Sequence, residues 1–108
     1  MKQREFPRLK DKVVLITGAA QGLGEALAIR LSEEGAKVVV GDMNVEGAKN
    51  VAAQLAEGIA TPLNVCDYDS CVAAVQLAVD TYGRLDYVVA NAGVVRSDAI
   101  EDMTYKEF

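Results

Sequence analysis

Three glycines stand close together at Gly18, Gly22 and Gly24, directly after the apolar segment 13–16. A helical pattern begins at the same place, so the glycines occupy a turn between a strand and a helix. Glycine lets a backbone approach a bound group closely, and the first N–H groups of a helix attract anions. The segment predicts a turn that holds the phosphates of a nucleotide, although an ordinary tight turn can also be rich in glycine. No Gly-Lys-Ser or Gly-Lys-Thr sequence occurs, which excludes a P-loop.

A single acidic residue, Asp42, closes the second apolar segment, 37–41. It follows the glycines by about 20 residues, the spacing at which a carboxylate accepts hydrogen bonds from both hydroxyls of an adenosine ribose. Its charge would repel a 2′-phosphate, so Asp42 predicts NAD rather than NADP as the cofactor. Met43, directly after it, belongs to the same predicted site. The alternative is a surface aspartate that only ends a strand.

Strands and helices alternate along the chain that must position these residues. The segments predicted as strands are 13–17, 37–41, 59–65 and 85–90. This alternation is typical of an α/β protein with a doubly wound parallel sheet and helices on both faces. The predicted strand order is 3-2-1-4, with ligands bound where the order reverses. The sheet is expected to be incomplete, because no fifth strand covers the apolar edge formed by 85–90.

The predicted helices pack through stripes of apolar residues at helical spacing. In the first helix the residues that recur at helical spacing are Leu23, Ala26, Leu27, Arg30 and Leu31, all apolar except Arg30. The second stripe is Ala48, Val51, Ala52 and Leu55, and the third is Tyr68, Val72, Val75 and Val79. Asn44 and Asp67 are expected to cap the second and third helices, and the three helices are expected to end at Gly35, Gly58 and Gly83. Pro62 places the third strand at an edge or gives it an irregular start.

Composition limits the classes of function. The net charge of −5 disfavours nucleic acid or an anionic membrane as a partner. No apolar run is long enough to span a membrane and no signal peptide is visible, so a cytoplasmic location is expected. The absence of histidine excludes His-based triads and His metal sites, and no metal site is predicted. Cys66 and Cys71 are expected to be free thiols, and residues 1–11 a solvated tail.

Four motifs in order resemble those of the short-chain dehydrogenase/reductase family. The first is Thr-Gly-x-x-x-Gly-x-Gly, which begins here at Thr17, and the second is the NAD-selective acid, here Asp42. The segment 63–67 resembles the family's Asp-Val segment after strand 3, and the segment 90–93 resembles its Asn-Asn-Ala-Gly. The resemblance covers residues 12–108 and implies part of one Rossmann dinucleotide-binding domain over that range.

By position, the resemblance implies these cofactor contacts. The backbone around the pyrophosphate and its ribose would come from Gly18, Gln21, Gly22, Leu23 and Gly24. Asn64 and Val65 would flank the adenine, through the Asn64 side-chain amide and the Val65 N–H. The ribose on the nicotinamide side would be lined by Asn91, Ala92 and Gly93, which also help to hold strand 4 against strand 1. Asn64 replaces the common Asp and can still accept a hydrogen bond. Ala90 replaces the first Asn of its motif.

The resemblance also implies which catalytic groups to look for. In the family a Tyr transfers the proton that accompanies hydride transfer, a Lys four residues later lowers its pKa, a Ser orients the substrate oxygen, and an Asn supports a proton relay. All four lie beyond strand 4. No Tyr in these 108 residues is followed by a Lys at that spacing. Tyr68, Tyr82 and Tyr87 are followed there by Val72, Asp86 and Asn91, and the fourth neighbour of Tyr105 would lie beyond Phe108. Catalytic residues are therefore expected beyond Phe108, and the 108-residue chain alone is expected to bind NAD weakly and to catalyse nothing.

The predicted function is that of an NAD-dependent oxidoreductase that interconverts a secondary alcohol and a ketone, present here as its cofactor-binding half. The substrate would be a small molecule, and the full-length enzyme is expected to be a homo-oligomer. Parts of the chain are similar to sugar-alcohol dehydrogenases of the sorbitol-6-phosphate type. Two alternatives stay open. One is a fragment of a 3-oxoacyl carrier-protein reductase, which Asp42 disfavours because those enzymes mostly use NADP. The other is a non-catalytic nucleotide-binding module.

Overall fold

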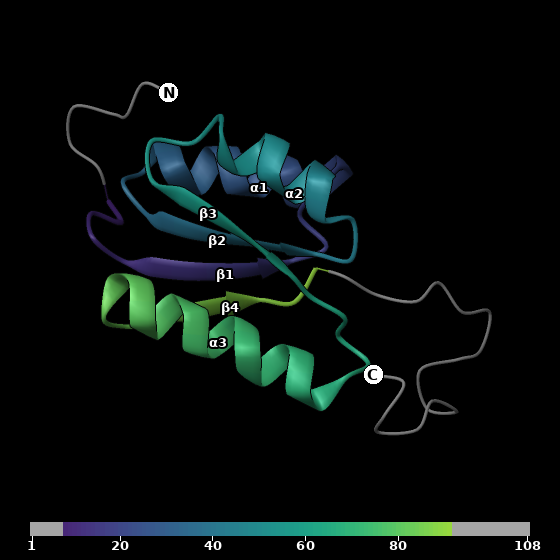
Figure 1. Cartoon of the computed structure of the whole chain (residues 1–108). Helices are drawn as coiled ribbons and strands as arrows, with labels where there is room; N and C mark the ends of the chain where they lie inside the picture. Colours follow the sequence, from purple (N-terminus) through teal and green to yellow (C-terminus); the bar gives the residue numbers. More distant parts are fainter. Residues whose placement is uncertain (1–7, 92–108) are drawn as a thin grey trace, which may run out of the picture.

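A four-stranded parallel sheet forms the centre of the chain in a computed structural model that describes residues 8–91 (Figure 1). The strands are β1 (Val13–Thr17), β2 (Lys37–Asp42), β3 (Gly58–Pro62) and β4 (Tyr87–Val89). The helices are α1 (Gly22–Glu33), α2 (Val45–Ala52) and α3 (Tyr68–Tyr82). The sheet order is β3-β2-β1-β4 and every neighbouring pair is parallel, which confirms the predicted fold class and strand order. The order reverses between β1 and β4, so the carboxyl ends of these strands flank a switch point.

Helices cover both faces of this sheet. Figure 1 shows α1 and α2 on one face and α3 on the other. Side chains alternate along β1, which is buried throughout: Val14 and Ile16 join the core beneath α1 and α2, while Val13 and Leu15 join the core that faces α3. Because both faces of such a strand are buried by helices, its sequence is a continuous run of apolar residues. Within residues 8–91, no helix is long and apolar enough to cross a membrane.

Small residues, rather than the predicted apolar stripe, bring α1 onto the sheet. Its buried positions are Gly24, Ala28 and Ser32, which are four residues apart and share one side of the helix. Small side chains allow the helix axis to lie close to the strands. The predicted stripe is wrong at three members, which are exposed: Leu23, Ala26 and Arg30. Leu27 and Leu31 are partly buried at the edge of the core.

The predicted packing face of α3 is also wrong. Ala74 and Ala78 are fully buried against the sheet, whereas the predicted stripe faces outward. The exposed fractions of that stripe are 81% for Tyr68, 47% for Val72, 39% for Val75 and 40% for Val79. The outward face of α3 is therefore apolar in the described part of the chain.

Four predicted helix ends are confirmed. The Asn44 side chain accepts a hydrogen bond from the Gly47 N–H at 3.1 Å, which caps α2. The Asp67 side chain accepts one from the Asp69 N–H at 3.0 Å, which caps α3. Beyond α1 and α3, Gly35 and Gly83 take left-handed backbone with φ of 96° and 81°. Such a residue ends a helix at little cost only when it lacks a Cβ.

The region around the third strand differs from the prediction. The helix α2 ends at Ala52, where the Leu55 N–H donates back to the Ala52 carbonyl in a tighter turn, and Gly58 begins β3 opposite Val38 rather than ending the helix. The strand ends at Pro62, shorter than predicted; the next N–H, of Leu63, still donates to the Asp42 carbonyl at 3.1 Å, and the N–H of Asn64 donates to the Ser70 hydroxyl of α3. As predicted, the strand that contains Pro62 lies at an edge of the described sheet.

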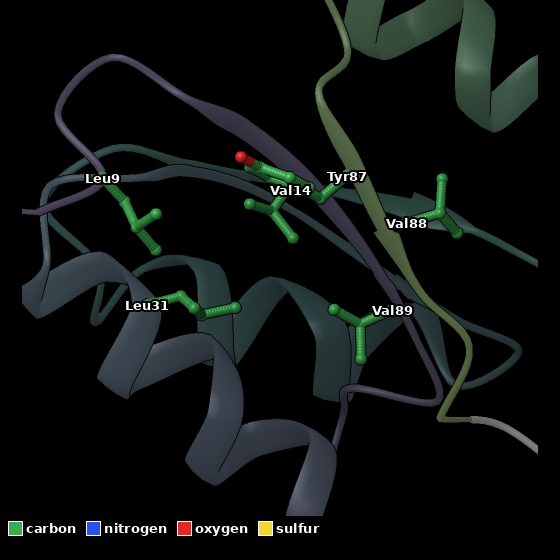
Figure 2. A pocket seen from close by; sticks show the side chains of 6 residues that line it. All are labelled: Leu9, Val14, Leu31, Tyr87, Val88 and Val89. Atoms are coloured by element: carbon green, nitrogen blue, oxygen red, sulfur yellow. The ribbon is translucent and has the colours of Figure 1, made fainter.

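The strand β4 forms the other edge of the described sheet and is shorter than predicted. The Val13 N–H donates to the Asp86 side chain at 2.8 Å and the Asp86 N–H donates to the Val13 carbonyl at 2.9 Å, and the paired register with β1 begins at Tyr87, opposite Val14. Tyr87 and Val88 are 51% and 55% exposed, which agrees with the predicted apolar edge. Figure 2 shows an apolar hollow beside this edge, where Val14 and Val89 point from the sheet toward α1. Leu9, from the predicted tail, also lines the hollow and packs against the core.

Candidate nucleotide site

The turn between β1 and α1 has a backbone that could accommodate an anion. Gly18 and Gly22 adopt left-handed φ values of 63° and 60°, which a residue with a Cβ adopts only with strain. Gln21 precedes the helix with an extended backbone, and its side chain makes no capping hydrogen bond. The N–H groups of the first turn are therefore not capped by this side chain. Gln21, Gly22 and Leu23 are all exposed, so a ligand can reach them.

Gly24 brings the start of α1 into direct contact with this turn. A Cβ at Gly24 would overlap the Gly18 carbonyl oxygen and would lie 2.7 Å from Asn91 Nδ2 and 2.8 Å from Ala19 Cα. These neighbours are mostly backbone atoms, which cannot move aside cheaply. The third glycine of the motif is thus needed for close packing, while Gly18 and Gly22 are needed for backbone conformation.

Asp42 lies at the glycine turn, as the sequence predicted. Its Oδ2 accepts a hydrogen bond from the Ala20 N–H at 2.9 Å, and its Oδ1 accepts one from the Asn44 N–H at 2.9 Å. The side chain is half-buried, and each carboxylate oxygen keeps a lone pair for another donor. The two bonds fix the carboxylate between the end of β2 and the turn. A ribose placed there could donate both of its hydroxyls to it.

Asn91 ties the end of β4 to the same turn. Its N–H donates to the Thr17 hydroxyl at 3.0 Å, and its side-chain Nδ2 donates to the Gly18 carbonyl at 3.1 Å. The switch point between β1 and β4 is therefore bridged by hydrogen bonds. Ala92 and Gly93, the other predicted residues of this motif, lie outside the described residues.

The predicted adenine residues lie on the loop between β3 and α3. The Asn64 side-chain oxygen accepts the Cys66 N–H at 3.0 Å, which orients the amide. Val65 is 42% exposed, and Met43, after Asp42, is 72% exposed. Exposed apolar side chains on both loops suit the flat, apolar faces of a nucleobase.

Three supporting groups were not singled out from the sequence. The Ala20 N–H, the Thr17 hydroxyl and the Ser70 hydroxyl hold Asp42, Asn91 and the Asn64 backbone respectively. Thr17 opens the glycine motif, so its position was a usable signal. Ser70 lies within the first turn of a capped helix, where a hydroxyl commonly meets nearby backbone N–H groups.

The profile of the family described as short chain dehydrogenase matches residues 12–108. This chain belongs to the short-chain dehydrogenase family. The match includes every residue of the candidate nucleotide site. Members of this family use nicotinamide cofactors, so the coarse class of the predicted cofactor is supported.

Individual members of the short-chain dehydrogenase family agree with this assignment. An uncharacterized oxidoreductase of Staphylococcus aureus (strain USA300) is 40% identical over 102 residues, which cover 93% of this chain and 44% of that protein. A 2,5-dichloro-2,5-cyclohexadiene-1,4-diol dehydrogenase of Sphingobium indicum is 42% identical over 99 residues, or 88% of this chain and 40% of that protein. The crystal structure of a hydroxysteroid dehydrogenase from Escherichia coli superposes with a TM-score of 0.80 at 31% identity, over 90% of this chain and 43% of that one. The chain spans less than half the length of these relatives.

Proposed function

We propose that this chain is the cofactor-binding half of an NAD-dependent oxidoreductase. The observation that carries the proposal is the 2.9 Å hydrogen bond between the Ala20 N–H in the glycine turn and the Asp42 carboxylate. A negative charge beside the glycine turn supports the proposal, because the adenosine ribose of a dinucleotide meets such a turn at this point. A free ribose diol can donate to this carboxylate, whereas a 2′-phosphate would be repelled by it.

The other predicted residues take roles that fit their positions. The exposed start of α1, at Gln21, Gly22 and Leu23, would bind the pyrophosphate through backbone N–H groups and the positive end of the helix dipole. Asn64, Val65 and Met43 would enclose the adenine. Asn91 would line the nicotinamide-side ribose, together with Ala92 and Gly93. Gly18 and Gly24 keep the backbone close enough for these contacts.

The bound nicotinamide would supply a hydride acceptor or donor, and the reaction is proposed to interconvert a secondary alcohol and a ketone. The dehydrogenases among the relatives are named for a cyclohexadiene diol and a hydroxysteroid, which supports this class. A sugar alcohol of the sorbitol-6-phosphate type is a further candidate substrate. The proton-transfer groups are proposed to lie beyond Phe108, so the 108-residue chain by itself would be inactive. A homo-oligomeric, cytoplasmic full-length protein completes the proposal.

A comparative titration tests the cofactor. NADH and NADPH would be added separately to the chain, and binding followed by calorimetry or by nicotinamide fluorescence. We expect NADH to bind at least about tenfold more tightly, because one unfavourable charge contact costs more than 1.4 kcal/mol. Equal affinities, or a preference for NADPH, would overturn the assignment to NAD. Binding of neither dinucleotide would remove the proposed site altogether.

A further inference from the structure

Two cysteines occupy paired positions at the start of α3. Asp67 is the N-cap of this helix, as its hydrogen bond from the Asp69 N–H shows. Cys66 therefore stands one residue before the cap and Cys71 at the fourth helical position. Side chains at these two positions commonly pack against each other and fix the angle at which the chain enters the helix. The sequence separates the two thiols by five positions, and the positions that they occupy are ones whose side chains can meet across a helix start.

The Cys71 sulfur lies against the backbone that leads into Cys66. It is 3.8 Å from the Asn64 carbonyl oxygen and 3.9 Å from the Val65 carbonyl oxygen, within reach of weak S–H hydrogen bonds. The Val65 carbonyl belongs to the peptide group that joins Val65 to Cys66. Cys66 itself is exposed. Cys71 is half-buried and lines a surface hollow with Val72, Val75 and Gln76, so a small oxidant can reach both sulfurs.

The same contacts orient the proposed adenine loop. The Cys66 N–H donates to the Asn64 side-chain oxygen at 3.0 Å, so the position of Cys66 sets the direction of the Asn64 amide. The Cys71 thiol is the donor near the carbonyls of Asn64 and Val65. Any reaction that joins the two sulfurs would remove that donor and turn Cys66 toward α3. Both changes act on the two residues proposed to hold the adenine.

We propose that Cys66 and Cys71 form a redox-sensitive thiol pair, which a peroxide converts to a disulfide within one chain, and that this disulfide weakens dinucleotide binding. In the first step the Cys66 thiolate attacks one peroxide oxygen, which gives a sulfenic acid and releases water after proton uptake. In the second step the Cys71 sulfur displaces the hydroxyl as a second water. The two thiols lose two electrons and the peroxide gains them. A small thiol such as dithiothreitol reverses the change by exchange.

The chemical step is tested by intact-mass spectrometry on the protein after treatment with hydrogen peroxide and then with an alkylating agent. We expect the monomer to lose about 2 Da, the mass of two hydrogen atoms, and to take up no alkyl group until dithiothreitol is added. Cys66→Ser and Cys71→Ser should each be unable to form the link. Two alkylated cysteines after peroxide, a disulfide between two chains, or Cys66 oxidised alone would each overturn the proposal.

The effect on the site rests on the proposed function and is measured separately. Oxidised protein should bind NADH about tenfold more weakly than reduced protein, the loss expected for one or two hydrogen bonds. Peroxide-treated Cys66→Ser, which keeps the backbone N–H to Asn64, should retain the affinity of the reduced parent. Unchanged NADH affinity in the disulfide form would overturn the coupling.

Failure of the proposed function has a different signature. If reduced protein binds neither NADH nor NADPH, the nucleotide site itself is wrong. The thiol pair is then judged by mass and by amide hydrogen exchange. Without any cofactor present, oxidation should change amide hydrogen exchange at residues 64–67 and leave α1 unaffected. Equal exchange in the oxidised and reduced forms would count against the coupling.

Discussion

The Ala20 N–H donates a hydrogen bond of 2.9 Å to Asp42, so the end of β2 holds the glycine turn that follows β1. The second carboxylate oxygen accepts the Asn44 N–H, which fixes the start of α2 in the same way. The residue proposed to select the cofactor therefore also supports the loop that would bind the phosphates. A ligand that bonds to Asp42 would meet a carboxylate already held in place, and less entropy would be lost on binding.

The variants Asp42→Asn and Asp42→Ala test the two roles of Asp42, which are to select the cofactor and to support the glycine turn. Both variants should lose about tenfold or more in NADH affinity, because a hydrogen bond to a charged acceptor contributes about 1.5–3 kcal/mol. NADPH should be affected less, since a repulsive charge is removed at the same time, so the preference for NADH shrinks. Calorimetric titration of both dinucleotides measures this ratio.

Asp80→Asn is the matched control for this titration, because Asp80 is an exposed acid on α3 whose carboxylate bonds the Gln76 side chain. It should leave both affinities unchanged. Asp42→Ala should in addition lower the free energy of unfolding by about 1–3 kcal/mol, since the Ala20 N–H loses its acceptor. A variant at Asp42 that keeps the parent's preference for NADH would argue against its proposed role.

The glycines of the motif should respond differently to substitution. Gly24→Ala would place a Cβ 2.7 Å from Asn91 Nδ2 and against the Gly18 carbonyl, so we expect a loss of about 1–3 kcal/mol in the free energy of unfolding. Gly22 has φ of 60° with no atom near its missing Cβ. Gly22→Ala should therefore cost about 1 kcal/mol from backbone strain alone, and Gly22→Asn less, because Asn tolerates this conformation.

Urea denaturation of four variants measures these differences: the Ala and Asn substitutions at Gly22 and at Gly24. The two positions should differ in their response to Asn. At Gly22 Asn relieves part of the backbone strain, whereas at Gly24 no residue with a Cβ fits. If Gly24→Asn proved as stable as Gly22→Asn, the close contact between α1 and the turn would be wrong.

The sequence predicted the strand order and the convergence at the switch point because these follow from alternation and from two short motifs. It failed on the helix faces for a physical reason. A helix that lies close to a parallel sheet buries small residues, so Ala28 in α1 and Ala78 in α3 are fully buried while Val79 is 40% exposed. A search for large apolar residues at helical spacing selects the wrong side of such a helix. The small residues repeated every four positions were the better signal.

The bounds of two strands could not be predicted from the sequence, because side chains bond to the backbone there. The Asp86 carboxylate accepts the Val13 N–H where β4 begins, and the Ser70 hydroxyl accepts the Asn64 N–H after β3 ends. Both strands are shorter than their apolar runs suggest. Asp86 lies 73 residues from Val13 in the sequence, whereas Ser70 lies only 6 residues from Asn64.

The two faces of α3 give a direct test of the corrected packing. Ala78→Leu should lower the free energy of unfolding by about 1–3 kcal/mol, because Ala78 is fully buried and the added atoms have no space. Val79→Lys, at the adjacent position, should change stability by no more than about 0.5 kcal/mol, since Val79 faces outward. Chemical denaturation of both variants measures the difference. If Val79→Lys proved the more destabilising of the two, α3 would pack on the sheet through the apolar stripe that the sequence suggested.

Asp86 should make the stability of the fold depend on pH in the acid range. The hydrogen bond from Arg84, and then the one from the Val13 N–H, hold the pKa of the Asp86 carboxyl below its usual range. The unfolded chain therefore takes up this proton at a higher pH than the folded chain does. The contribution of Asp86 to stability is complete above about pH 4 and is lost as the pH falls through the lower folded pKa.

Asp86→Asn should flatten the decline of stability in acid, because an amide does not titrate yet still accepts the Val13 N–H. Arg84→Ala should flatten it in part, since it removes the first cause of the lowered pKa while leaving the Val13 bond. Urea denaturation at several values between about pH 2 and 7 gives the three curves. A decline in Asp86→Asn as steep as in the parent would mean that the link between Asp86 and the start of β1 does not control the acid stability of this fold.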